Sequence, residues 1–257
     1  MQMPVASPRW QIAGSQAIVI ALLVVTVHHR AVDGGFVRDD NSAIVENRLI
    51  HSPHGLRDFW CSTTQPDYWP VSYSVLWLEW RVFGPTPTGY RAVNIGLHAV
   101  NALLVWRLLM MLDVPSPWLC ALLFAVHPVT VEAVAWIIQI KTLLSMLFAL
   151  ATLMLFLRWQ ATGPWRYLVA ALAAFVLALL SKSTVVTLPV ALLVIVWWRQ
   201  GRLTRRDLLA LLTLLAISLV LGGIGTWFQS HNAISGDIVR TDSFWSRLAI
   251  AARAVWF

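Results

Sequence analysis

The chain has 257 residues, of which 58% are hydrophobic and 12% are charged, and its formal net charge is +7. Soluble domains carry about 25% charged residues, so this composition excludes an ordinary water-soluble protein. The two cysteines, Cys61 and Cys120, lie in different settings, which excludes a disulfide framework. Because much of the positive charge collects in short connections between apolar segments, it reflects membrane topology and does not indicate nucleic-acid binding.

About seven apolar segments follow one another along the chain, and each helical bilayer crossing needs about 20 such residues. The segments are residues 12–28, 92–112, 117–127, 133–158, 166–181, 183–198 and 208–228. The third, fifth and sixth are shorter than a full crossing, so we expect them to be tilted, broken or extended by flanking residues. The sequence therefore predicts an all-α, polytopic transmembrane helical bundle over residues 1–257, with no soluble repeat domain.

The first apolar segment carries no small-residue cleavage pattern, which indicates a retained anchor and not a removed signal peptide. Arginines crowd the connections at 158–166 and 199–206, and both fall on the same side as Arg9 if every segment crosses. Short loops rich in Lys and Arg stay in the cytoplasm. The N-terminus is therefore predicted to be cytoplasmic, and the loop over residues 29–91 to be extracytoplasmic.

The long first loop contains a second kind of helix. Between Val71 and Phe83, apolar residues alternate with serines, Glu79 and Arg81, which is typical of an amphipathic helix in the membrane interface. Indole rings suit that depth, because they are apolar with one polar group. The tryptophans of this region are Trp60, Trp69, Trp77 and Trp80.

An adjacent acidic pair, Asp39 and Asp40, stands in the same loop, about ten residues past the first segment. Neighbouring carboxylates raise one another's pKa and can share a proton or a divalent cation, as a general base or a metal-bound phosphate site requires. The alternative is a solvated turn in which Arg38 is their partner.

Ionisable residues in or near the apolar segments are functional candidates, because they are expensive in hydrocarbon. Lys141 and Lys182 are expected in the outer half of the membrane, where they either bind an anionic group such as a lipid phosphate or snorkel to the interface. His127 and Glu132 form a second outer-surface pair. They support such a site or, alternatively, cap a helix together, and their spacing is not that of a zinc-binding helix.

A polar stripe marks one face of the second main segment, at Arg91, Asn94, His98 and Asn101. Such a stripe faces protein or a water-filled cavity. We expect His98 and Asn101 to form interhelical hydrogen bonds, and Arg91, at the outer end, to reach a ligand.

Several stretches together resemble one family. They are the runs at 36–47, 68–81 and 89–99, the run Phe124-Ala125-Val126-His127-Pro128-Val129 with Glu132 to Ile137, and the run Ser181-Lys182-Ser183 through Pro189. These are similar to the membrane half of bacterial tetratricopeptide-repeat membrane proteins and of the eukaryotic transmembrane-and-tetratricopeptide-repeat O-mannosyltransferases, which belong to the GT-C class of glycosyltransferases. We therefore expect this sequence to be part of a longer design or a shortened relative of one.

The resemblance implies transfer of a sugar, mannose among the candidates, from a polyprenyl-phosphate carrier to a protein or glycan hydroxyl on the extracytoplasmic side. An acidic residue of the first outer loop acts in this class as base or metal ligand, a role that falls here to Asp39 or Asp40. Lys182, Arg91 and Lys141 are then the residues expected to hold the phosphate. The bacterial resemblance further implies a multi-pass protein of the inner membrane, surrounded by membrane lipids.

The chain departs from the family where relatives carry a Glu-Arg-Lys-Asn-type run, because Gln139, Ile140, Lys141 and Thr142 stand there instead. Two charges are missing from the expected site. The second hypothesis is accordingly a non-catalytic membrane subunit or lipid-binding scaffold derived from the family. A transporter is the third, but the paired broken helices of two matching halves that many transporters show are not seen.

Overall fold

The protein is represented by a computed structural model that describes residues 9–233 and 243–254. In this part of the chain every regular element is a helix and no strand occurs. The first eight residues, for which a cytoplasmic location is predicted, lie outside the described residues.

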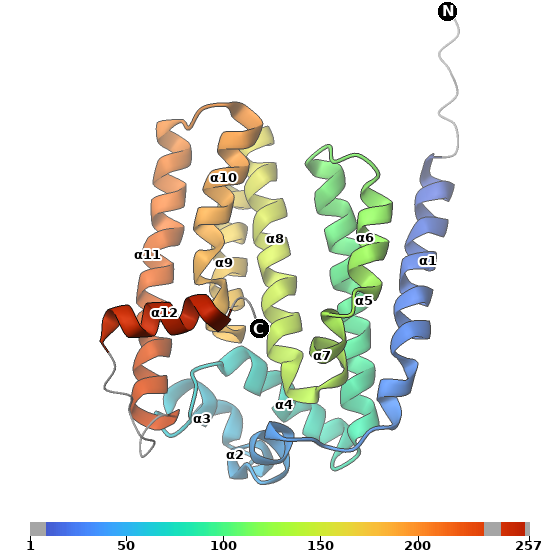
Figure 1. Ribbon diagram of the computed structural model, residues 1–257, viewed down its shortest axis with the longest axis vertical. Coiled ribbons are helices and arrows are strands. Elements are labelled where there is room, and N and C mark those ends of the chain that lie inside the picture. The colour runs from blue at the N-terminus through green and yellow to red at the C-terminus, as the bar shows by residue number, and fades with distance from the viewer. Residues whose placement is uncertain (1–8, 234–242, 255–257) are drawn as a thin grey trace, which may run out of the picture.

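Figure 1 shows upright helices side by side, with a layer of short helices across one end. The upright helices are α1 (Arg9–His28), α5 (Pro87–Met111), α6 (Pro117–Val126), α8 (Ile140–Thr162), α9 (Trp165–Ser181), α10 (Leu188–Gln200) and α11 (Arg205–Phe228). The layer at the lower end contains α2 (Arg48–His51), α3 (Gly55–Cys61) and α4 (Pro70–Phe83). The short α7 (Thr130–Ala135) joins α6 to α8, and α12 (Phe244–Ala254) comes last.

Five of the described helical stretches are long and apolar enough to cross a bilayer. They are Gly14–Asp33, Pro87–Met111, Ile137–Thr162, Ser183–Gln200 and Arg205–Asn232. Pro117–Val126 and Trp165–Ser181 are apolar but shorter, as the sequence predicts. The 3-10 turn η4 (Ser183–Thr187) and α10 together form the span Ser183–Gln200, so the predicted segment 183–198 changes helix type within its length and extends two residues farther. The all-α, polytopic class is thus confirmed.

Glycines and a capping box determine where three of the helices begin or end at the upper tip of the bundle. Gly163 and Gly201 follow α8 and α10 with φ values of 93° and 66°, a region that glycine adopts without strain. Thr204 and Asp207 form a capping box at the start of α11, which satisfies main-chain N–H groups that the helix leaves free. The arginine-bearing connections are therefore short and well defined.

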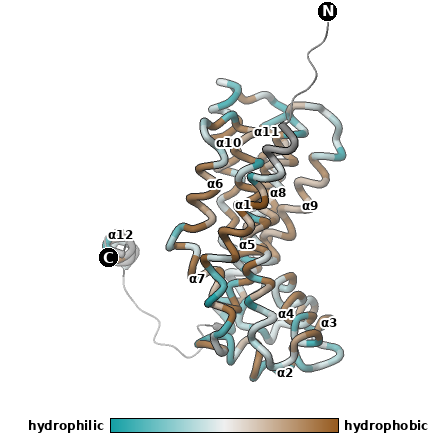
Figure 2. The backbone as a smooth tube through the Cα atoms, turned by 90° about the vertical axis from the view of Figure 1, so that its right-hand side faces the viewer, coloured by the Kyte–Doolittle hydropathy of each residue, from teal (hydrophilic) through white to brown (hydrophobic). Residues whose placement is uncertain are grey.

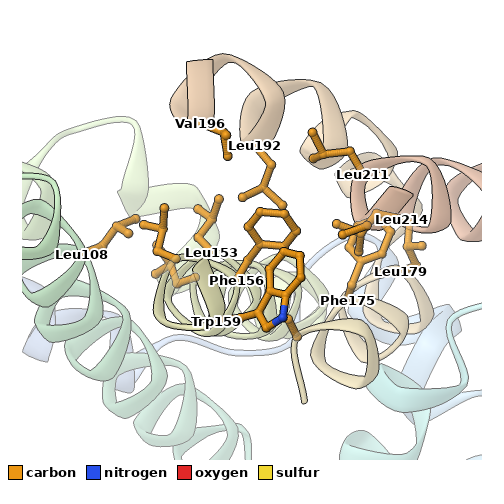
Figure 3. Close-up of a cluster of buried hydrophobic side chains, with 14 residues drawn as sticks. Leu108, Leu153, Phe156, Trp159, Phe175, Leu179, Leu192, Val196, Leu211 and Leu214 are labelled. Carbon is orange, nitrogen blue, oxygen red and sulfur yellow. The ribbon is translucent and has the colours of Figure 1, made fainter. Parts of the chain in front are cut away.

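Three clusters of buried side chains hold the described residues together, and the third of them packs α1, α5 and α6 against one another. The first joins α8 to α9, α10 and α11, and Figure 3 shows Phe156 and Leu192 facing one another in it, with Phe175 close by. The second fixes the lower layer to the ends of α5 and α8, and is referred to below as the lower core. Its fully buried members include Ile44, Ile50, Phe59, Tyr90 and Ile137. Burial of large apolar side chains contributes about 1.5–3 kcal/mol each.

The upright helices consist largely of hydrophobic residues, as the brown stretches of the tube in Figure 2 show, and many of their large apolar side chains are exposed. Leu219 of α11 is 71% exposed and Val190 of α10 is 59% exposed. Exposed apolar surface of this kind is stable in contact with lipid and not with water.

The predicted surface helix over Val71–Phe83 is confirmed as α4. Its inner face is buried at Tyr73, Leu76 and Glu79, whereas Val82 on its outer face is 73% exposed. The Ser72 hydroxyl donates to the carbonyl oxygen of Ser181 at 2.9 Å, and this bond ties α4 to the lower end of α9.

The polar stripe of α5 makes the interhelical hydrogen bonds that its spacing predicts. Asn101 donates to the carbonyl oxygen of Leu143 in α8 at 3.0 Å, and the His98 ring pairs with the carbonyl oxygen of Ala125 in α6, also at 3.0 Å. All the side chains of the stripe are at most 2% exposed. These bonds fix α6 and the start of α8 against α5, which positions the site described next.

Candidate functional site

Asp40 is the buried member of the acidic pair. It is 0% exposed, and its two carboxylate oxygens accept main-chain N–H groups from Val37 at 3.0 Å and from Ile138 at 2.9 Å. Burial raises the pKa of Asp40, while these two hydrogen bonds and the charge of Arg91 oppose that rise. The carboxylate therefore fastens the first loop to the start of α8.

Arg91 serves the same junction from the opposite side. It is 2% exposed and donates through Nε to the carbonyl oxygen of Ala135 at 3.0 Å. Its two terminal nitrogens donate to the carbonyl oxygens of Gly34 and Gly35. A Cβ on Gly34 would lie 3.2 Å from the guanidinium, so the small residue permits this close approach. Arg91 thus clamps the first loop against α7, and its guanidinium is occupied by main-chain oxygens.

Asp39 is exposed and lies at a polar cavity of about 210 Å³ in the lower layer. The cavity is also lined by Asn47, Gln65, Trp69 and Lys141. Its residues come from the first loop, from the segment before α4 and from the start of α8. Although Asp39 and Asp40 are adjacent in sequence, the carboxylate of Asp39 therefore lies at the cavity, whereas that of Asp40 is buried and hydrogen-bonded to the main chain.

Lys141 supplies the positive charge of this cavity. Its ammonium nitrogen lies 4.2 Å from the centre of the Trp69 ring, which is within the range of a cation–π contact. It also lies within electrostatic reach of Lys182, Asp67, Asp39 and Asp40. An ammonium beside an aromatic face and a polar cavity is arranged to meet an anion.

Lys182 approaches the same region from the end of α9. The backbone there is extended, with φ −161° and ψ 129°, and this break in the helical run separates α9 from η4. The Lys182 ammonium donates to the hydroxyl of Thr142 at 2.8 Å. Burial lowers the pKa of Lys182, and the carboxylate of Glu132 opposes that effect. Lys182 therefore contacts Thr142, the residue that directly follows Lys141 in α8.

A chain of hydrogen bonds links Glu132 to Lys182. Gln139 donates to the Glu132 carboxylate at 3.3 Å and accepts from the Thr142 hydroxyl at 2.6 Å. Gln139 and Thr142 therefore form the middle of this chain. His127 acts locally, because its ring accepts the main-chain N–H of Val129 at 3.2 Å, and the partner of Glu132 is Gln139.

The acidic pair is poorly arranged for a shared divalent cation. Both oxygens of Asp40 already accept main-chain N–H groups, whereas Asp39 faces the cavity. In the described residues no group of three or more His, Cys, Asp or Glu side chains converges as a metal site would require. We therefore derive no chemical step that passes through a metal ion.

Sequence reasoning identifies only Asp39 and Lys141 among the cavity residues. Gln65 and Asp67 stand in a stretch without a motif, and the position of Trp69 indicates an interfacial residue. The side chain of Asp67 accepts a hydrogen bond from Gln229, at the end of α11, at 2.8 Å. A signal for the cavity was the cluster of polar residues directly before a predicted helix, but nothing in the sequence connected that cluster to Lys141.

The comparisons with known proteins concern most of these elements. Residues 65–224 match the family described as dolichyl-phosphate-mannose-protein mannosyltransferase. Protein O-mannosyl-transferase F38B6.6 of Caenorhabditis elegans is 32% identical over 153 residues, which cover 54% of this chain and 22% of that protein. Protein O-mannosyl-transferase TMTC3 of Mus musculus is 28% identical over 188 residues, covering 67% of this chain and 20% of that protein. No solved structure matches the chain.

A longer but less similar match is Protein O-mannosyl-transferase Tmtc2 of Drosophila melanogaster, 28% identical over 260 residues that cover 88% of this chain and 27% of that protein. The chain therefore spans about a fifth to a quarter of the length of these relatives. Lys141 and Lys182 fall within the matched range of 65–224, and Asp39 precedes it. Since that range is more than half of the chain, the expected resemblance is confirmed, and the chain belongs to the dolichyl-phosphate-mannose-protein mannosyltransferase family.

Proposed function

We propose that this protein transfers a mannosyl group from a polyprenyl-phosphate carrier to a hydroxyl group of a protein on the extracytoplasmic side of the membrane. The observation that carries the proposal is the cavity in which Asp39 and Lys141 lie together. It offers a carboxylate for a hydroxyl and an ammonium for a phosphate. The names of the relatives supply the sugar and the protein acceptor.

Asp39 is the proposed base. Its carboxylate takes the proton of the acceptor hydroxyl as that oxygen forms a bond to the anomeric carbon of the sugar. The bond between the anomeric carbon and the phosphate oxygen breaks, and the polyprenyl phosphate leaves with the electron pair. The exposure of Asp39 suits this role, because a base must reach the hydroxyl directly.

Lys141 and Lys182 are the proposed partners of the donor phosphate, whose negative charge grows as the sugar leaves. Charge-assisted hydrogen bonds to phosphate are about twice as strong as neutral ones. Asp40 and Arg91 act at a distance from the sugar, by holding the loop that carries Asp39. Glu132 and His127 support the site through the hydrogen-bond chain and the turn described above.

The proposed orientation places the N-terminus in the cytoplasm and the lower layer of Figure 1 outside, in the inner membrane of a bacterium. With α6 and α9 counted, the seven upright helices would cross in alternating directions, as the arginine-bearing loops require. The lower layer would then meet extracytoplasmic acceptors.

A second candidate function is that of a non-catalytic membrane subunit that binds lipid-linked sugar or a partner. The observation in its favour is the neutral pair Gln139 and Ile140, which stands where the resemblance leads us to expect a Glu and an Arg. Under this alternative Lys182 still binds the donor, but Asp39 takes no proton.

The test uses the protein in nanodiscs, supplied with a polyprenyl-phosphate mannose and an acceptor peptide. We expect Asp39→Asn to abolish transfer while donor binding is retained, and Lys182→Met to weaken donor binding while Lys182→Arg restores part of it. Asp33→Asn, which neutralises an exposed carboxylate elsewhere in the same loop, is the matched control. Full transfer by Asp39→Asn refutes the catalytic assignment, and donor binding by a protein that shows no transfer supports the subunit alternative.

A further inference from the structure

A second cavity lies at the opposite end of the molecule from Asp39. It has a volume of about 630 Å³ and is formed by the last turns of α5 and α8 and by the end of α10. Figure 1 places these helix ends at the upper tip of the bundle, away from the lower layer. None of its lining residues belongs to the proposed sugar site.

The walls of this cavity are apolar. Leu104 and Met111 of α5 face Met154 and Leu155 of α8 across it. These residues belong to two of the five candidate membrane spans, so the cavity opens at the level of the bilayer. At that level, the acyl chains of lipids are the abundant apolar groups that could enter the cavity.

The rim of the cavity is positively charged. Arg107, Arg158 and Arg199 come from three different helices and all line it. Each of the three side chains is exposed, and within the described part of the chain no ion pair neutralises them. The guanidinium of Arg158 lies 5.0 Å from the Tyr167 ring, a cation–π contact in which the arginine keeps its charge.

We propose that this groove binds an anionic glycerophospholipid, with the phosphate between the three guanidinium groups and an acyl chain along the apolar wall. The charge on the rim selects an anion, because guanidinium groups match phosphate oxygens in geometry. The apolar wall selects a lipid over a free phosphate ion. Basic pockets between membrane helices are suited to such headgroups.

Binding at this place has a structural consequence. α5 carries Arg91, which clamps the first loop, and α8 begins beside Lys141. A lipid wedged between the upper ends of these two helices therefore holds the same elements that position the cavity at their lower ends. The proposal itself requires neither sugar transfer nor a particular orientation of the protein.

The experiment compares lipid retention by native mass spectrometry after the protein is exposed to phosphatidylglycerol or phosphatidylcholine. We expect phosphatidylglycerol to be retained preferentially, and Arg107→Gln/Arg199→Gln to reduce that retention about tenfold or more. The matched control is Arg202→Gln/Arg205→Gln, which removes two exposed arginines of the neighbouring loop. It should leave retention unchanged.

A second variant, Ala151→Phe, fills the apolar wall without altering charge, and it should also lower retention. Size-exclusion profiles and helical circular dichroism show whether each variant is folded. Equal retention of the two lipids overturns the proposal. So does an equal loss in the groove variant and in the loop control, because that result would indicate diffuse surface charge and not a site.

Discussion

Asp39 and Asp40 are adjacent in sequence, yet the structure predicts opposite consequences for their replacement. The perturbation is the pair of single substitutions Asp40→Ala and Asp39→Asn. Asp40→Ala removes the acceptor of two buried N–H groups, those of Val37 and Ile138, and leaves Arg91 without a nearby carboxylate. Asp39→Asn removes a charge from an exposed side chain that faces the cavity.

The expected magnitudes follow from these contacts. A buried N–H group left without an acceptor costs about 1–3 kcal/mol, and Asp40→Ala leaves two of them. We therefore expect Asp40→Ala to lower the free energy of unfolding by about 2–6 kcal/mol. The expected loss for Asp40→Asn is about 1–3 kcal/mol, because one acceptor oxygen remains. Asp39→Asn should change stability by less than about 0.5 kcal/mol.

The assay is unfolding of the purified protein in mixed micelles by increasing sodium dodecyl sulfate, followed by tryptophan fluorescence. Transfer of mannose is measured on the same samples. Asp40→Ala should lose activity together with stability, whereas Asp39→Asn should lose activity alone. A stable Asp40→Ala protein, or an Asp39→Asn protein destabilised by more than about 1 kcal/mol, would refute the assignment of the two roles.

Three further predictions concern other parts of the molecule. Burial raises the pKa of Glu79 to about 8. The stability that the protonated Glu79 contributes is complete below the pKa of the unfolded state and is lost as the pH rises to about 8. The free energy of unfolding should therefore fall by about 1.4 kcal/mol per pH unit in that window. Glu79→Gln should remove this slope, and an unchanged slope contradicts the assignment. Gly55→Ala should destabilise the lower layer, because its Cβ would lie 1.7 Å from the main-chain oxygen of Leu49, whereas Gly96→Ala, with nothing within 4 Å, should be tolerated. A cysteine at Arg202, in a Cys61→Ser background, should react with an impermeant reagent only from the cytoplasmic side; labelling from outside reverses the topology.

The helices were accessible to sequence reasoning because periodicity and charge determine them locally. The amphipathic run of α4 and the polar stripe of α5 each repeat with the period of a helix, and both faces are buried as expected. Arg91 shows the limit of that reasoning. Its position on the stripe was correct, but its partners are the carbonyl oxygens of Gly34 and Gly35, which no pattern identifies.

The cavity was only partly predictable, because its residues come from segments far apart in the chain. The pair formed by Lys141 and Trp69 depends on how α8 meets the segment before α4, and that contact arises from packing of the lower core. The division of roles between Asp39 and Asp40 depends on the main-chain N–H of Ile138, which donates a hydrogen bond to Asp40. The conformation of the loop determines which of the two carboxylates receives that bond. Side-chain chemistry alone left the two equivalent.

The expected departure from the family at Gln139 and Ile140 affects the hydrogen-bond chain, because Gln139 is one of its members. In this chain the ammonium of Lys182 donates to a neutral hydroxyl, and the Glu132 carboxylate is held two bonds farther along by Gln139. Lys141 therefore lines the cavity, and Lys182 contacts the neighbouring Thr142, with its ammonium bonded to a hydroxyl and not to a carboxylate. Like charges held in reach of one another are stabilised when an anion lies between them. Under the proposed function, the loss of charged neighbours would make the site more dependent on the phosphate of a donor and would leave both ammonium groups able to bind one.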